Sequence, residues 1–163
     1  MAASMGLNFE KFDILMGDCF DVLTITGIVT IATMLLRVKP FGLFVLGPPC
    51  GWWVWISSSI HGRHSGNVMG NTNIRGVHRA NHLARVVAGL IRLAVSRDVR
   101  FILEQPLSSM MPNFPAIEKT LRKASRGDVL STILHVGHSS FVVLRHRCLN
   151  RDRSQAHRYV CCT

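Results

Sequence analysis

The stretch LFVLGPPC, residues 43–50, decides the fold that we expect for this chain. Its first four residues are apolar and suit a short buried strand. The Gly-Pro-Pro sequence that follows ends the strand, because proline has no N–H group with which to continue a sheet ladder. The two prolines also fix the backbone, so Cys50 stands rigidly just beyond the strand.

Strands and helices alternate on both sides of this stretch. Residues 12–16 form an apolar run that predicts a strand, and residues 22–38 predict a buried helix capped by Asp21. Apolar side chains then recur on one face of a helix expected over residues 77–96. The remaining predicted elements are strands over residues 100–103, 129–136 and 140–144, and a helix over residues 115–125. This order indicates an α/β fold with a Rossmann-like, mostly parallel sheet and helices on both faces.

Three chemically capable residues follow predicted strands. Asp18 comes after the first strand, Cys50 after the second and Glu104 after the third. Because ligands bind such sheets beyond the carboxyl ends of the strands, we expect these side chains at one edge. A cysteine there suits a nucleophile, and partial burial of a carboxyl group favours the protonated form that donates a proton. The alternatives are a buried apolar cysteine and a structural carboxylate bound to loop amides or to an arginine.

The composition favours one basic globular domain. The 163 residues include 48% hydrophobic and 17% charged residues, and this much apolar surface excludes a disordered chain. Nineteen Lys and Arg residues against nine Asp and Glu give a net charge of +10, and fifteen of the nineteen are Arg. Arginine forms bidentate bonds to phosphate, so nucleic acid is the expected partner. Solubility or an acidic protein partner explains the charge equally well.

The sequence predicts neither a membrane segment nor a secretory signal. The longest apolar run, residues 22–36, is too short to cross about 30 Å of hydrocarbon comfortably. The first twelve residues lack the basic start and the apolar stretch of a signal peptide. The five cysteines are an odd number without CxxC spacing, which argues against a disulfide framework and a structural zinc site. We therefore expect an intracellular, reducing compartment. If the substrate is DNA, that compartment is the nucleus.

The order of these motifs resembles that of the cytosine-C5 DNA methyltransferases. Gly-Pro-Pro-Cys after a strand, followed later by a strand that ends in Glu-Asn, is the signature of that family. The resemblance implies that Cys50 attacks C6 of a flipped-out cytosine and that Glu104 holds and protonates N3. The Gly-Asp turn is similar to the family motif whose aspartate contacts the adenine of S-adenosylmethionine, so Asp18 and Pro48 are assigned to the cofactor site.

A further element of the resemblance lies near the end of the chain. Arg145-His146-Arg147 is similar to the family's Arg-x-Arg element, which bears on the target cytosine and its phosphate. The resemblance covers residues 12–147, which we take as one methyltransferase-like domain followed by a basic tail over residues 148–163.

The chain also departs from the family pattern. Nothing before Phe12 supplies the glycine-rich Phe-x-Gly-x-Gly loop that cradles the cofactor, or the acidic residue for its ribose. Gln105 replaces the asparagine of Glu-Asn, and no room remains after Arg147 for a target recognition domain. We therefore expect the N-terminal, cofactor-binding part of the fold to be truncated, and to be supplied by a longer chain or by a partner subunit.

The long connection over residues 50–73 is a second candidate region, because long loops in compact domains are often functional. Trp53 is predicted to stack on bases, and Arg63 and Arg79 to contact nucleic acid. Core packing of the tryptophan and solvated surface arginines are the alternatives. Strand-like alternation would place Trp55 on the same side as Trp53. Histidines at positions 78 and 82 are one helical turn apart, but no carboxylate accompanies them as in HExxH, so we expect no metal site.

Three functions remain open at this stage. The first is methyl transfer from S-adenosylmethionine to a nucleic-acid base through Cys50. The second is a non-catalytic nucleic-acid-binding or scaffold module that keeps the fold without the cofactor. The third is an unrelated α/β protein in which Cys50 and Glu104 are structural.

Overall fold

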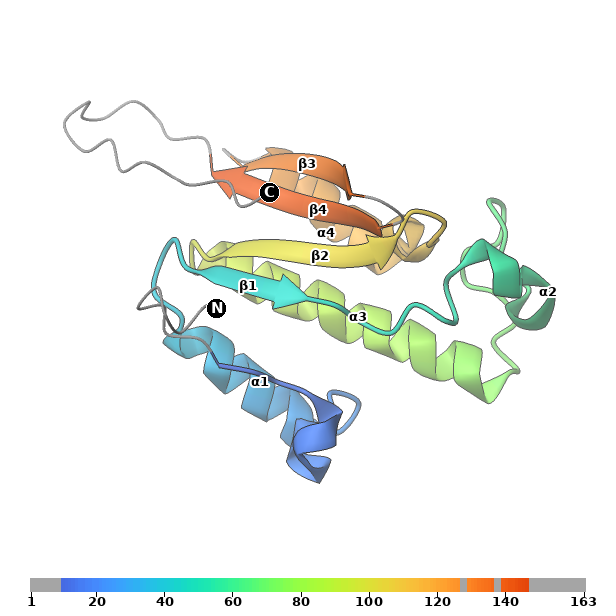
Figure 1. Cartoon of the computed structure of the whole chain (residues 1–163), viewed down its shortest axis with the longest axis horizontal. Helices are drawn as coiled ribbons and strands as arrows, with labels where there is room; N and C mark the ends of the chain where they lie inside the picture. Colours follow the sequence, from blue (N-terminus) through green and yellow to red (C-terminus); the bar gives the residue numbers. More distant parts are fainter. Residues whose placement is uncertain (1–9, 127–128, 137–138, 147–163) are drawn as a thin grey trace.

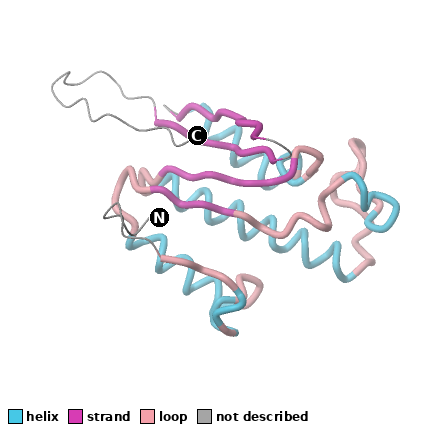
Figure 2. The backbone as a smooth tube through the Cα atoms, in the orientation of Figure 1, coloured by secondary structure: helices cyan, strands magenta, loops and turns pink. Residues whose placement is uncertain are grey.

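The computed structural model describes residues 10–126, 129–136 and 139–146. They form a mixed α/β structure with four α-helices and one four-stranded sheet (Figures 1 and 2). The elements are α1 (Ile25–Arg37), β1 (Leu43–Leu46), α2 (Ser58–His61), α3 (Arg75–Ser96), β2 (Arg100–Pro106), α4 (Pro115–Arg126), β3 (Val129–Val136) and β4 (Ser139–His146). Short 3-10 helices are η2 (Ile14–Met16), η3 (Asp18–Phe20), η4 (Trp55–Ser57) and η5 (Met111–Asn113). In this part of the chain, no helix is both long enough and apolar enough to cross a membrane.

The sheet has the strand order β1-β2-β4-β3. β1 and β2 are parallel, with Leu43 opposite Arg100 and Leu46 opposite Leu103. α3 lies between them in the chain, as a parallel connection requires. β4 is antiparallel to both β2 and β3, so the sheet is mixed rather than mostly parallel as predicted. The antiparallel pairing of β3 with β4 follows from the two residues between them, because so short a connection permits only a hairpin.

The core lies between the sheet and two helices on one side of it. Figure 1 shows α3 and α4 together behind the sheet, so these two helices share a face instead of covering both faces as predicted. In β2, Phe101, Leu103 and Gln105 are buried and alternate with half-buried residues, because successive side chains of a strand point to opposite faces. α3 supplies much of the remaining core through the face that runs from Val77 to Ala94.

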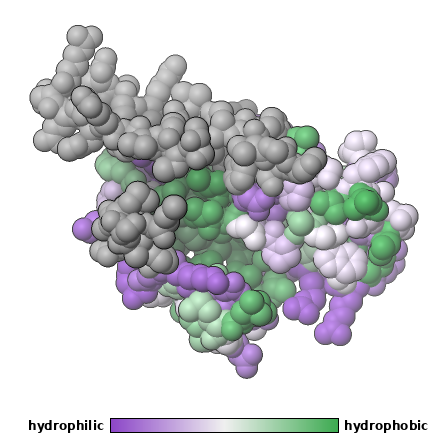
Figure 3. Space-filling model, in the orientation of Figure 1, coloured by the Kyte–Doolittle hydropathy of each residue, from purple (hydrophilic) through white to green (hydrophobic). Residues whose placement is uncertain are grey.

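Helix α1 and strand β1 are less buried than the sequence predicts. In α1, Ile31 and Leu35 are buried, whereas Ile25 and Val29 are 83% and 57% exposed. Val45 of β1 is 60% exposed. β1 has a single neighbour in the described sheet, so its apolar run is not covered on both faces as in a central parallel strand. Figure 3 shows the apolar surface that results over β1 and β2.

Helix α1 is capped by Thr24 and not, as predicted, by Asp21. Thr24 Oγ1 accepts a hydrogen bond from the Gly27 N–H at 3.0 Å, which is the usual bond of an N-cap residue. Asp21 instead caps the preceding turn by accepting from the Leu23 N–H at 2.9 Å. A Cβ on Gly27 would lie 1.9 Å from the Asp21 carbonyl oxygen, so the chain can fold this closely over the helix start only with glycine there.

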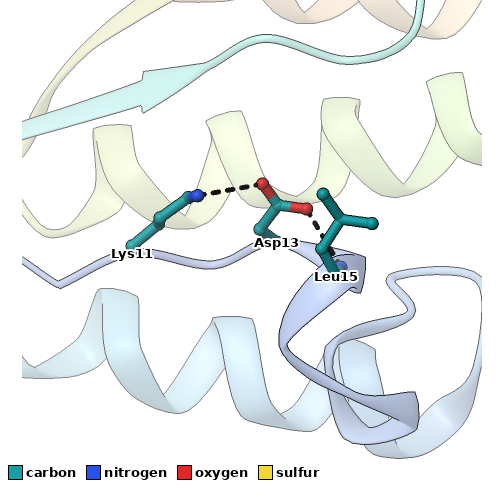
Figure 4. A network of polar contacts seen from close by, with 3 residues as sticks. All are labelled: Lys11, Asp13 and Leu15. Atoms are coloured by element: carbon teal, nitrogen blue, oxygen red, sulfur yellow. Dashed lines mark hydrogen bonds and ion pairs between the residues drawn. The ribbon is translucent and has the colours of Figure 1, made fainter.

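Residues 12–16 are not the predicted strand, because Ile14–Met16 forms a 3-10 helix. Asp13 caps this helix by accepting from the Leu15 N–H at 3.1 Å, and Lys11 Nζ lies 3.2 Å from Asp13 Oδ2 (Figure 4). The bond from Leu15, together with Lys11, lowers the pKa of the Asp13 carboxyl group below its usual value. The Asp13 side chain thus accepts a hydrogen bond from the nearby backbone, and this local hydrogen bond competes with those of a strand pair.

Candidate functional site

The loop that carries Cys50 is fastened to the end of strand β2. Gln105 is buried, and its Nε2 donates to the carbonyl of Pro48 at 2.7 Å. Its Oε1 accepts from Ser109 Oγ at 2.8 Å, so the amide is held on both sides. Cys50 is half-buried, and its carbonyl accepts from the Trp53 N–H at 2.7 Å. Cys50 therefore stands at the start of a closed turn, beyond the end of β1.

Glu104 lies against the same loop. The register of β1 and β2 brings Gly47 beside Glu104, and a Cβ on Gly47 would lie 3.7 Å from Glu104 Oε2. Glu104 is half-buried and points to the opposite face of the sheet from Gln105. It belongs to β2 itself, because the strand continues beyond the predicted end. The structure thus places a carboxyl group against the Gly-Pro-Pro segment that precedes Cys50.

The two groups are chemically complementary. A cysteine thiolate is a strong nucleophile, and a carboxyl group can supply the proton that an attacked ring takes up. Cys50 follows β1 and Glu104 lies near the carboxyl end of β2, which is where parallel sheets bind ligands. This edge, formed by Gly47, Cys50 and Glu104, is named the thiol rim below.

Asp18 is not carried to the thiol rim by a strand. It is exposed and begins η3, which packs against α1. The segment before it is a 3-10 helix, so Asp18 does not follow a strand of the described sheet. The predicted convergence of three side chains is therefore wrong for Asp18, because the first predicted strand is not part of the sheet.

Arg145, the described member of the predicted arginine pair, is not brought to Glu104 either. Arg145 lies on β4, which pairs Phe141 with Glu104 and Val143 with Ile102. The antiparallel direction carries Arg145 toward the amino end of β2, roughly 13 Å along the strand from Glu104 at about 3.3 Å per residue. Arg147 and the predicted basic tail lie outside the described residues.

Two of the three residues predicted to contact nucleic acid are buried. Trp53 has no exposed surface and Arg63 is 1% exposed, so neither side chain can reach a nucleic acid in this structure. Trp55, by contrast, is 63% exposed. The predicted alternation of the two tryptophans does not occur, because the chain enters η4 at Trp55 instead of continuing as a strand. Arg79 is exposed on α3.

Arg63 is buried, and it takes part in a polar network that the sequence pattern did not predict. Its Nε, Nη1 and Nη2 donate to the Trp52 carbonyl at 2.7 Å, the Val68 carbonyl at 2.5 Å and Asn81 Oδ1 at 2.9 Å. Its Cζ lies 3.7 Å from the ring centroid of Trp53, in a cation–π contact. A signal was present in the sequence, because Asn81 is a polar residue on the apolar face of its helix and such a residue needs a buried partner.

His61 extends this network. It is buried, its Nδ1 accepts from the Arg63 backbone N–H at 3.1 Å, and its Nε2 lies 3.1 Å from the Val54 carbonyl oxygen. These two bonds place the proton on Nε2, because a carbonyl oxygen can only accept. Asn81 Nδ2 in turn donates to the Met69 carbonyl at 3.0 Å. The network therefore joins both halves of the long loop to α3.

The positive charge of Arg63 is stabilised by hydrogen bonds to neutral oxygen atoms. Within residues 10–126, none of the ion pairs involves Arg63. Burial lowers the pKa of its guanidinium to about 10, which still leaves it protonated at neutral pH. Because this pKa is lower in the folded than in the unfolded chain, the cost of burial is fully present below pH 10 and diminishes as the pH rises further.

The described side chains include no group of three His, Cys, Asp or Glu residues that could hold a metal ion. Comparison of the chain with protein-family models, curated proteins and solved structures finds no match. The geometry of the thiol rim and the motifs that form it are therefore the basis for assigning a function to this chain.

Proposed function

We propose that this chain is a cytosine-C5-methyltransferase-like domain in which Cys50 attacks a cytosine-like ring of a nucleic acid and Glu104 acts as the acid. The observation that carries the proposal is the position of Glu104 against the Gly-Pro-Pro-Cys loop, at the carboxyl ends of two parallel strands. In the family that the sequence resembles, the same two residue types follow strands in the same order and act on the same base.

In this proposal, Cys50 and Glu104 activate the cytosine-like ring. The Cys50 thiolate forms a C–S bond at C6, and the electron pair of the C5–C6 double bond moves into the ring. A proton from Glu104 to N3 neutralises the charge that develops there. The product is a neutral adduct in which C5 is nucleophilic, and C5 is the atom that receives the methyl group in the family that the chain resembles.

The contacts of the described residues do not bring together Asp18 and Pro48, the two residues assigned to S-adenosylmethionine. Asp18 is exposed beside α1, and the carbonyl of Pro48 is bonded to Gln105. We therefore derive no step through the cofactor. In our proposal its binding residues come from a longer chain or from a partner subunit. The unit β1-α3-β2 supports a Rossmann-like sheet as the complete architecture, in which further parallel strands would add beside β1, the edge strand of the described sheet.

Covalent trapping tests this function. An oligonucleotide in which 2-pyrimidinone replaces one cytosine lacks the 4-amino group and forms a stable adduct with an attacking thiolate without a methyl donor. We expect an adduct that maps to Cys50 by mass spectrometry, that Cys50→Ser abolishes and that Glu104→Gln slows by about a hundredfold, the usual size of an acid-catalysis effect. An intact, folded chain that forms no adduct on single-stranded or duplex DNA or RNA would overturn the enzymatic proposal.

One observation supports nucleic-acid binding without involving Cys50, and binding alone is what the non-catalytic alternative requires. The 22 residues of α3 contain no Asp or Glu, and its exposed face carries Arg75, His78, Arg79, His82 and Arg85 at helical spacing. This row, named the α3 basic face, suits the phosphates of a nucleic acid whether or not chemistry follows. Salt-dependent binding without an adduct at Cys50 would select this alternative.

A further inference from the structure

We propose that Arg63 is a positioning residue for Cys50: it clamps the turn that begins at Cys50 against helix α3. This inference rests on the proposed function only in taking Cys50 as the reacting thiol. Arg63 is buried and is not proposed to touch a substrate atom.

The first half of the clamp holds the far end of the turn. The Trp53 N–H donates to the Cys50 carbonyl at 2.7 Å, so the turn runs from Cys50 to Trp53. Arg63 contacts the last two residues of that turn. Its Nε donates a hydrogen bond to the Trp52 carbonyl, and its guanidinium lies over the Trp53 ring. The near end of the turn is held by the bond from Gln105 to Pro48. Cys50 thus stands between two fixed points.

The second half of the clamp is anchored in the core. Arg63 Nη2 bonds Asn81 on the buried face of α3, and Nη1 bonds the Val68 carbonyl. The ring of Trp52 lies directly on Gly76 in the first turn of α3, where a Cβ would approach it to 2.1 Å. Arg63 and Trp52 therefore fix the position of Cys50 relative to helix α3, and not only relative to the rest of the loop.

The chemistry of the guanidinium explains why arginine stands at this position. Three oxygen acceptors and one aromatic face surround the group, and a planar fork with several donors can satisfy them together. Lysine would keep the charge but offers a single point of attachment. Methionine would fill the space and leave the carbonyls of Trp52 and Val68 and the amide of Asn81 without these bonds.

The test measures Cys50 in two ways, in the full chain with every other cysteine replaced by serine. The first is the pH profile of alkylation by iodoacetamide, which needs only an accessible thiolate. The second is the rate of adduct formation with the 2-pyrimidinone oligonucleotide, which needs a correctly placed thiolate. The replaced cysteines are Cys19, Cys148, Cys161 and Cys162.

We expect Arg63→Met to speed alkylation by about threefold, because the half-buried thiol becomes freer, and to slow adduct formation by about a hundredfold. Arg63→Lys should change both rates in the same directions by smaller factors. Arg37→Met is the matched control, because Arg37 is exposed on α1 and its ion pair among the described residues is with Glu10 on the surface; both rates should stay unchanged.

A role in stability alone would lower the adduct rate only in proportion to the folded fraction measured by circular dichroism, while alkylation would rise with the unfolded fraction; this outcome would overturn the proposal. If Arg63→Met fails to fold, Asn81→Ala removes only the anchor on α3, and the same opposite changes in the two rates are expected. A wild-type chain that is alkylated but forms no adduct would contradict the proposed function, while the alkylation rate of each variant, measured where circular dichroism shows it fully folded, would still decide for or against the clamp.

Discussion

Trp53 and Arg63 show how strongly the surroundings decide the role of a single side chain. Both belong to residue types that commonly contact nucleic acids, yet both are buried, and their partners are backbone carbonyls, one amide and each other. Nothing in the two residues themselves indicates this. Two glycines beside the network are more informative, because a Cβ on Gly70 would lie 2.6 Å from the His61 carbonyl oxygen and a Cβ on Gly76 would lie 2.1 Å from the Trp52 ring.

Gly76→Ala is expected to destabilise the protein, although alanine normally stabilises a helix interior. The new Cβ would lie 2.1 Å from the Trp52 ring, which must then leave the first turn of α3. We expect a loss of about 1–3 kcal/mol in the free energy of unfolding, the usual cost of overpacking. Urea unfolding measures it, and a shift in tryptophan emission reports the displaced ring.

Gly89→Ala, in the same helix, provides the control for this prediction. The nearest atom to its new Cβ, Arg92 Nη2, is 3.9 Å away, so the substitution fits. It should stabilise the protein by about 0.5–1 kcal/mol through the helix propensity of alanine. Equal effects of the two substitutions would show that Trp52 does not lie on Gly76.

At the scale of elements, α3 has two functions on two faces. Its inner face packs against the sheet and binds Arg63 through Asn81, whereas its outer face is the α3 basic face. The absence of acidic residues along the whole helix means that no neighbour on α3 neutralises these arginines. A helix of this kind is suited to bind a polyanion along its length.

Arg75→Ala and Arg79→Ala should each weaken the binding of a fluorescent oligonucleotide. Both side chains are exposed, and each lost phosphate contact should reduce the slope of log affinity against log salt by about 1. Fluorescence anisotropy at several salt concentrations measures the slope. Arg37→Ala on α1 should leave it unchanged. If all three variants gave the wild-type slope, the α3 basic face would not be the binding surface.

At the scale of the whole molecule, apolar surface remains uncovered beside the β1 edge of the sheet. Ile25 and Val29 of α1 and Val45 of β1 are all more than half exposed. The described sheet ends at β1, so this surface lies where the proposed additional strands would add.

The double variant Ile25→Glu, Val29→Glu is expected to reduce the fluorescence of a neutral hydrophobic dye bound to the native protein by about half. Its free energy of unfolding should change by less than about 0.5 kcal/mol, because both side chains are already exposed. Ile31→Glu on the buried side of α1 should cost several kcal/mol, because it buries a charge. Undiminished dye binding in the double variant would mean that the dye binds elsewhere.

The sequence by itself determined the local elements whose signals are local. The strand before Gly-Pro-Pro, the long amphipathic helix, the helix that starts at Pro115 and the strand predicted over residues 100–103 are all present, because apolar periodicity and proline act within a few residues. The strand predicted over residues 12–16 failed for an equally local reason, the cap that Asp13 provides.

Tertiary structure alone decided which residues meet. The position of Glu104 beside Gly47, the exclusion of the segment before Asp18 from the sheet and the direction of β4 relative to β2 all depend on strand pairing between distant segments. The burial of Arg63 depends on acceptors spread from Trp52 to Asn81. Periodicity within one segment carries no information about such partners, since it shows which face is apolar and not what that face will contact.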